Sequence, residues 1–154
     1  MSQQFPLQPL LDIANTRMDD AARRLGELIA SERNSQQKLE MLQDYRTEYQ
    51  TRFTAAVQEG IGPDLWRNFT TFLSRIDEAI EAQRLAVQKS RHQTAQGQQV
   101  WVNQRNRVKA FDTLSKRYQA DQVRAENRRE QKMTDEHAAK RYHSTNSDQE
   151  GNDI

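Results

Sequence analysis

One short cluster of helix-breaking residues divides the chain. Between residue 10 and the C-terminal end, Gly and Pro gather only in the segment Glu59-Gly60-Ile61-Gly62-Pro63-Asp64. Gly60 can adopt the left-handed conformation that ends a helix. Pro63 suits the first turn of the next helix, because its missing N–H needs no partner there, and Asp64 adds a carboxylate to that positive first turn. Helical patterns lie on both sides, so this segment predicts the tip of a helical hairpin.

The composition is too polar for a thick globular core. Hydrophobic residues make up 34% of the chain, charged residues make up 29%, and the mean hydropathy is −1.08. Such a chain is either disordered or a thin helical protein, and periodicity decides between the two. The sequence has no cysteine, no apolar run of membrane-spanning length and no signal-peptide pattern at residues 1–5. We therefore expect a cytoplasmic location.

The residues before the tip repeat every seven positions. The first seam position is taken by Leu11, Met18, Leu25, Glu32, Leu39, Arg46 and Phe53, and the second by Ala14, Ala21, Leu28, Ser35, Leu42, Tyr49 and Ala56. A heptad sustained over this length predicts a left-handed coiled coil. Because Glu32, Ser35 and Arg46 interrupt the apolar seam, this helix needs a partner helix to fold.

The residues after the tip repeat at the same spacing. The seam pairs are Phe69/Leu73, Ile76/Ile80, Gln83/Val87, Ser90/Thr94, Gly97/Trp101, Gln104/Val108 and Phe111/Leu114. Both helices rise about 1.5 Å per residue, so residues equally far from the tip face each other in a hairpin. Phe53 then lies near Phe69, and Arg46 lies near Asp77 and Glu78. The weak positions Glu32 and Ser35 fall beside Ser90 and Arg91, which favours the hairpin and predicts a hydrated middle.

We therefore predict an all-α fold, a long two-helix antiparallel coiled-coil hairpin with an overhanging second helix. The expected order is a flexible N-terminus at 1–8, a first helix at about 9–59, a tip at 60–63, a second helix at about 64–142 and a disordered tail at 143–154. The second helix has no mirror partner from about residue 116, so it overhangs there. An intermolecular coiled coil is the alternative to this hairpin.

No motif for catalysis or cofactor binding is present in the sequence. It contains neither a Gly-rich phosphate loop nor a nucleophile elbow. The histidines His92, His137 and His143 include no pair at helical i, i+4 spacing. Solvated helical histidines explain them better than a metal site or a general base does. We expect no enzyme activity, no metal and no cofactor.

Residues 105–141 are basic, with eleven Lys/Arg and six Asp/Glu. Within them, Arg124, Arg128 and Lys132 are spaced at i, i+4 and i+8 and share one helix face. A solvated coiled-coil surface accounts for such charge without any function. The interleaved acids argue against nucleic acid, so an acidic protein surface is the better functional interpretation.

Aromatic residues gather near the tip. They are Tyr45, Tyr49, Phe53, Trp66, Phe69 and Phe72. Two helices cannot bury them all, and the seam accounts best for Phe53, Phe69 and Tyr49. Tyr45 and Phe72 are harder to place in the seam. An exposed aromatic patch on a charged protein is typical of a protein-binding hot spot.

The chain resembles the FliJ family of flagellar type III export proteins. The blocks that carry the resemblance are DDAARRLGE at 19–27, LEMLQDY at 39–45 with Glu48-Tyr49, Gly60-Ile61 with Trp66, Asn68 and Phe72, Ala79-Ile80 with Gln83-Arg84, AENR at 125–128, QKM at 131–133 and Asp135-Glu136. The resemblance implies a cytoplasmic antiparallel coiled coil similar to the central stalk of rotary ATPases. It also implies three kinds of partner: the hexameric flagellar export ATPase, the cytoplasmic domain of the membrane export gate, and export chaperones.

The resemblance further implies which residues bind these partners. The implied gate-facing surface consists of Leu42, Tyr45, Tyr49, Phe72, Ile76 and Ala79, and the family varies at the flanking positions Lys38 and Gln83. The implied ATPase contact suits Arg124, Arg128 and Lys132. The expected function is a non-enzymatic coupling component of flagellar export, needed for flagellum biogenesis and motility and peripheral at the cytoplasmic side of the membrane through its partners. The alternatives are a chaperone or escort for export substrates and a coiled-coil nucleic-acid binder.

Overall fold

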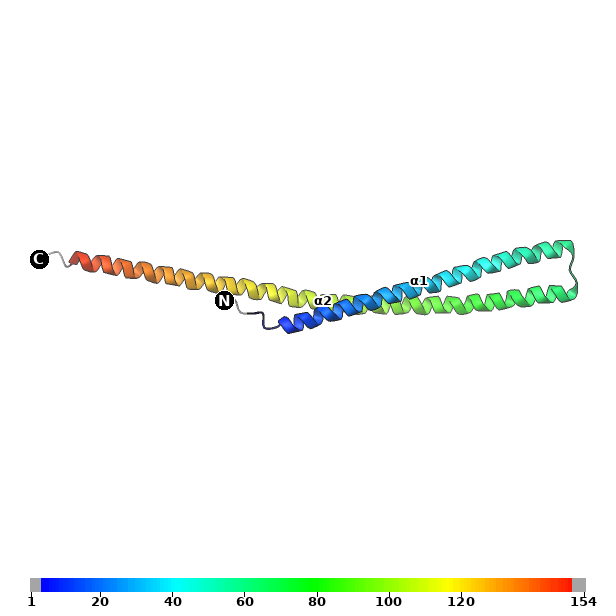
Figure 1. Ribbon diagram of the computed structural model, residues 1–154, viewed down its shortest axis with the longest axis horizontal. Helices are drawn as coiled ribbons and strands as arrows, with labels where there is room; N and C mark the ends of the chain where they lie inside the picture. The colour runs from blue at the N-terminus through cyan, green and yellow to red at the C-terminus, as the bar shows by residue number, and fades with distance from the viewer. Residues whose placement is uncertain (1–3, 151–154) are drawn as a thin grey trace. The chain divides into compact units, whose positions relative to one another are not determined.

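The computed structural model describes residues 4–150, which form two long helices joined by a short connection (Figure 1). Helix α1 spans Gln8–Glu59 and helix α2 spans Pro63–Glu150. Gly60 ends α1 with a φ of 92°, the left-handed conformation that the sequence required there. Residues 4–150 contain no strand. The all-α, two-helix hairpin is therefore confirmed.

The chain divides into two compact units, although the sequence led us to expect one coiled-coil domain. The first unit is Asn15–Asn106, which contains the hairpin connection. The second combines Met1–Ala14 with Arg107–Ile154, of which residues 4–14 and 107–150 are described.

The unit Asn15–Asn106 is an antiparallel coiled coil in the predicted register. Its core consists of Leu39, Ile76, Ile80 and Val87, against which Leu42, Tyr49 and Phe72 pack. Every α1 seam position predicted within this unit, from Met18 to Ala56, is buried or half-buried. The rings of Phe53 and Phe69 lie 5.2 Å apart, and Arg46 forms an ion pair with Asp77. Both contacts join residues at equal distances from the tip.

The polar middle of this unit is hydrogen-bonded between the helices. The Gln83 amide donates to the Ser35 carbonyl at 2.9 Å. The Thr94 hydroxyl lies 3.3 Å from the Leu28 carbonyl of α1 and 3.0 Å from the Ser90 carbonyl of its own helix. Ser90 is only 7% exposed. These polar side chains have partners within the chain, which reduces the cost of burying them. Hydration of the middle stays a prediction.

In the second unit, the N-terminal segment contacts α2. The rings of Phe5 and Tyr118 lie 5.7 Å apart. The half-buried positions of α2 continue through Ser115, Tyr118 and Gln122, whereas Leu114, the predicted seam residue, is 41% exposed. Residues 123–149 are all exposed. The overhang thus begins after Gln122 rather than near residue 116, because Phe5 supplies a contact ahead of α1.

Helix α2 continues to Glu150, beyond the end predicted at Tyr142. The hydroxyls of Ser144 and Thr145 donate to the carbonyl of Arg141, and the hydroxyl of Ser147 donates to the carbonyl of His143. These bonds satisfy the polar side chains without breaking the helix. The prediction of disorder from residue 143 therefore differs from the helix observed at 143–150. Residues 1–3 and 151–154, which belonged to the predicted flexible ends, lie outside the described part of the chain.

Candidate protein-binding surfaces

Six aromatic rings form a continuous series of contacts near the tip. Tyr45 lies 6.5 Å from Tyr49 and 6.1 Å from Phe72, and Tyr49 lies 4.5 Å from Phe72. The series continues through Phe69 and Phe53 to Trp66, with centroid distances of 5.1–5.2 Å. Rings at these separations attract one another beyond their burial, by about 0.5–1.5 kcal/mol a pair. The helical spacing of four on α1 and three on α2 brings them together.

The structure brings the six residues of the implied gate-facing surface onto adjacent parts of the two helices, but their exposure differs. Tyr45 is 45% exposed and Ala79 is also exposed. Leu42, Tyr49 and Phe72 are half-buried and pack against the core. Ile76 is only 5% exposed and belongs to that core. Tyr45 and Ala79 can therefore touch a partner directly, whereas Ile76 supports the surface from below.

The two flanking positions have different roles. Lys38 is exposed, but Gln83 is half-buried and its amide bonds the Ser35 carbonyl. Gln83 therefore belongs to the seam and not to a surface. Sequence reasoning missed Met41, which is 65% exposed and lies one turn from Tyr45. The sequence could have indicated Met41, because it is an apolar residue outside the heptad seam and lies one helical turn from Tyr45.

The implied ATPase-facing residues lie in the second unit. Arg124, Arg128 and Lys132 are exposed at successive turns of α2, in the segment that has no helix packed against it. Arg124 lies 3.9 Å from Asp121, an exposed pair worth at most about 1 kcal/mol. This basic face is thus left uncovered by the rest of the described chain.

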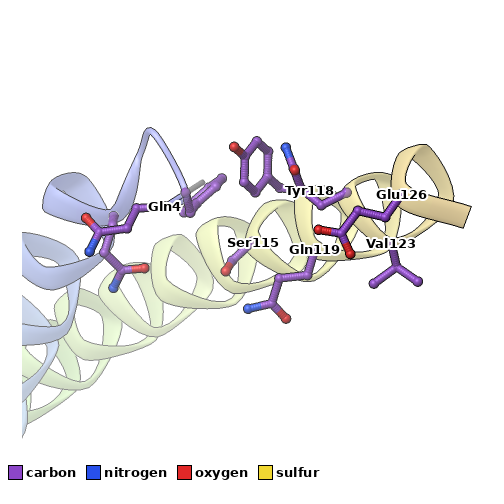
Figure 2. A pocket seen from close by; sticks show the side chains of 9 residues that line it. Gln4, Ser115, Tyr118, Gln119, Val123 and Glu126 are labelled. Atoms are coloured by element: carbon purple, nitrogen blue, oxygen red, sulfur yellow. The ribbon is translucent and has the colours of Figure 1, made fainter. Parts of the chain in front are cut away.

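The described part of the chain has an open pocket but no cluster of metal-ligating residues. Residues 4–150 contain no group of three or more His, Cys, Asp or Glu that could hold a metal ion. An open pocket lies beside the rings of Phe5 and Tyr118, where Ser115, Gln119 and Glu126 line it (Figure 2). Uncharged polar and apolar groups dominate this pocket, with Glu126 as its one charged residue. Among the described helices, none is both long and apolar enough to span a membrane.

The family model described as "Flagellar FliJ protein" matches residues 3–147. The chain belongs to the flagellar FliJ family. Its relatives include the "Flagellar FliJ protein" of Salmonella typhi, 34% identical over 138 residues, and that of Escherichia coli (strain K12), 30% identical over 138 residues. Each alignment covers 90% of this chain and 94% of the relative.

Membership confirms the resemblance seen in the sequence. The match to the FliJ family spans all of α1 and most of α2, so both candidate surfaces lie inside it. This FliJ-family chain is therefore a component of flagellar protein export. The roles of Tyr45 and of Arg124 in that process are matters for proposal.

Proposed function

We propose that this chain is a non-enzymatic, stalk-like coupling protein that links the flagellar export ATPase ring to the membrane export gate. The observation that carries the proposal is the presence of two exposed surfaces of different chemistry. One is aromatic and centred on Tyr45. The other is basic and follows Arg124, Arg128 and Lys132. A linking protein needs two such surfaces, because each must select a different partner.

The gate contact is proposed on the surface around Tyr45. Tyr45 is 45% exposed while its ring makes an edge contact with Phe72, so it is held in place before any partner binds. A fixed aromatic loses little side-chain entropy on binding, which suits a hot spot. Binding to the gate would also hold the chain at the cytoplasmic side of the membrane.

The ATPase contact is proposed on the basic face of α2. Residues 123–149 are exposed, so a partner that binds this helix would bury surface that the chain itself leaves uncovered. Arg side chains form charge-assisted bonds to carboxylates. Arg124, Arg128 and Lys132 therefore fit an acidic region of the ATPase.

The experiment is a pair of binding measurements at physiological salt, one with the cytoplasmic domain of the gate and one with the export ATPase. Duplex DNA is the competitor in both. Tyr45→Ala should weaken gate binding at least about tenfold, as hot-spot truncations do, while Tyr142→Ala, an exposed tyrosine elsewhere, should not. Reversal of charge at Arg124, Arg128 and Lys132 should weaken ATPase binding and spare gate binding.

The matched control for the basic face reverses three other charges on the same exposed helix: Arg129→Glu, Lys140→Glu and Arg141→Glu. Equal losses with both triple variants would reduce the contact to general electrostatics and remove the assignment. Binding to neither partner, with export substrates or DNA bound instead, would favour the escort or nucleic-acid role and contradict the coupling role.

A further inference from the structure

One side of the hairpin unit combines exposed apolar groups with unpaired cations. We call it the tyrosine flank and define it as Lys38, Met41, Tyr45 and Arg52 of α1 with Phe72, Arg75, Ala79, Ala86 and Lys89 of α2. All of these residues are exposed except Phe72, which is half-buried. The seam at Leu39, Ile76, Ile80 and Val87 lies beneath them.

The spacing of these residues places them on one flank. Lys38, Tyr45 and Arg52 follow one another at intervals of seven, as do Phe72, Ala79 and Ala86, and residues seven apart in a coiled coil share a face. The edge-on contact between Tyr45 and Phe72, at 6.1 Å, joins the two series across the helices. Arg75 and Lys89 lie three residues after Phe72 and Ala86, within reach of the same face.

The cations of this flank differ from those on the other side of the unit. Arg46 pairs with Asp77, Arg84 with Glu81, and Arg91 with Glu32. In the described part of the chain, Lys38, Arg52, Arg75 and Lys89 form no ion pair and no side-chain hydrogen bond. Glu48 lies four residues before Arg52 on the same face of α1 but forms no ion pair with these cations, so four cations stand beside one acid. The flank therefore presents uncompensated positive charge around its apolar centre.

The apolar centre has the form of a helix-binding strip. Ala79 and Ala86 are small and exposed, which lets a third backbone approach α2 closely. Tyr45 and Met41, 45% and 65% exposed, rise beside them from α1. A partner helix with an apolar face could place its large side chains over the alanines and pack its edge against these two residues.

We propose that the tyrosine flank binds an acidic amphipathic helix of a partner protein, which packs on the hairpin as a third helix. Its apolar face would cover Tyr45, Phe72 and Ala79, and its carboxylates would meet Lys38 and Arg75. This inference rests on the proposed gate contact and deepens it, since it states the chemistry that the gate segment must carry. The unpaired cations steer and orient the acidic helix, while the apolar strip supplies most of the affinity.

The test uses the full chain and a designed helical peptide of about three heptads, a length typical of a stable pairing. The peptide has Leu on one face and Glu on both borders of that face, and a second peptide has Lys in place of each Glu. The flank variant is Lys38→Glu with Arg75→Glu. Its matched control is Arg33→Glu with Arg67→Glu, two exposed cations that lie away from the flank. Circular dichroism checks that each variant is folded.

The Glu peptide should bind the unsubstituted chain, and the Lys peptide should not. In the flank variant the dissociation constant for the Glu peptide should rise about tenfold or more, with little change in the control. The affinity should also fall as salt is raised, because the rim charges are exposed. Equal binding of both peptides, or equal losses in the flank variant and the control, overturns the proposal.

The same variants measured against the cytoplasmic domain of the gate separate this inference from the proposed function. Gate binding that depends on Tyr45 but is unchanged in the flank variant overturns the acidic helix and leaves the coupling role intact. Flank-dependent binding of the Glu peptide, with no binding of the gate, supports the acidic helix and removes the gate as its source. A dimer of the chain alone, seen by sedimentation and lost in the flank variant, assigns the flank to a second copy and also overturns the proposal.

Discussion

Arg46 and Asp77 lie 31 positions apart in the chain, and their side chains form an ion pair across the hairpin. The hydrogen bond to Asp77 and the attraction of its charge raise the pKa of the Arg46 guanidinium. A raised pKa for a cation means that its stabilising effect is lost only when the pH rises through the folded-state value, far above neutrality. Arg46 can occupy a seam position because its stem packs there while its charged end reaches the edge. The pair therefore reports the register directly.

Cross-linking should capture this register within one chain. The sequence has no cysteine, so Arg46→Cys with Asp77→Cys creates one unique pair. A short bismaleimide should join the two thiols and give a product that migrates as a cross-linked monomer. We expect this product because α1 and α2 of the same chain pair in antiparallel orientation, which brings the two thiols close together.

The control variant is Thr47→Cys with Asp77→Cys, in which the α1 cysteine lies on a side of the helix that does not face α2. Its cross-linking should be much slower. A cross-linked dimer from the Arg46/Asp77 pair would instead show that the two helices pair between chains.

The two helical glycines of the hairpin unit should respond differently to alanine. A Cβ at Gly26 meets no atom within 4 Å, whereas a Cβ at Gly97 would lie 2.6 Å from Leu28 Cδ1. Gly26→Ala should therefore raise the free energy of unfolding by about 0.5–1 kcal/mol, the gain in helix propensity. Gly97→Ala should gain less, because Leu28 must move. Urea unfolding followed by circular dichroism measures both.

A double variant isolates the cause at Gly97. In the Leu28→Ala background the contact is gone, so Gly97→Ala should show a more favourable effect than in the unsubstituted chain. Equal gains at Gly26 and Gly97 in the unsubstituted chain would contradict the close packing of Gly97 on Leu28.

The core below the tyrosine flank should control stability. Ile80 is 5% exposed and belongs to the core cluster. Ile80→Ala should cost about 2–5 kcal/mol of unfolding free energy, because it removes buried methyl groups and leaves a cavity. Met41→Ala, at a residue 65% exposed, should change it by less than about 0.5 kcal/mol. Similar losses at both positions would mean that the packing is not organised around this cluster.

The exposed part of α2 should contribute little to thermal stability. Residues 123–149 are exposed and lie beyond the contact between Phe5 and Tyr118. A chain ending after Glu126 should melt within about 2 °C of the full chain, because no buried apolar surface is lost. Hydrogen exchange should also be fastest in this segment of the full chain.

Phe5→Ala provides the contrasting variant, since it removes a ring contact of the second unit. It should destabilise that contact by about 1 kcal/mol, which an exchange measurement at Tyr118 would detect. A large drop in melting temperature for the shortened chain would show that the terminal segment makes contacts that stabilise the fold.

Much of the hairpin could be predicted from the sequence, because the coiled coil is a local and periodic structure. Every predicted seam position from Leu11 to Ala56 is at least half-buried. The pairings of Arg46 with Asp77 and of Glu32 with Arg91 follow from equal distances to the tip. The Gly and Pro residues at 60–63 correctly predicted the connection between α1 and α2, and Gly60 has the positive φ that ends α1.

The site was less predictable, because exposure depends on which side of the seam a residue lies and on what packs beside it. The six residues of the implied gate surface include the buried Ile76 as well as the exposed Tyr45. Heptad spacing placed Ile76 and Gln83 in the seam, whereas the family resemblance placed Ile76 on that surface and Gln83 beside it. The structure agrees with the spacing, since the Gln83 amide bonds the Ser35 carbonyl of the other helix. A side chain that is long and polar can turn either to solvent or to a neighbouring carbonyl.

The sequence by itself determined the helices, their seam and their turn, since heptad spacing and helix breakers act over a few residues. Only the tertiary structure decided how far the seam continues and which cations are left unpaired. In α2, Ser115 is half-buried and takes the seam position, whereas Leu114 is exposed. The contact between Phe5 and Tyr118 follows within the next turn. Among residues 4–150, Lys38 has no anionic partner while Arg91 has Glu32. These outcomes depend on contacts between residues far apart in the chain, which local periodicity does not specify.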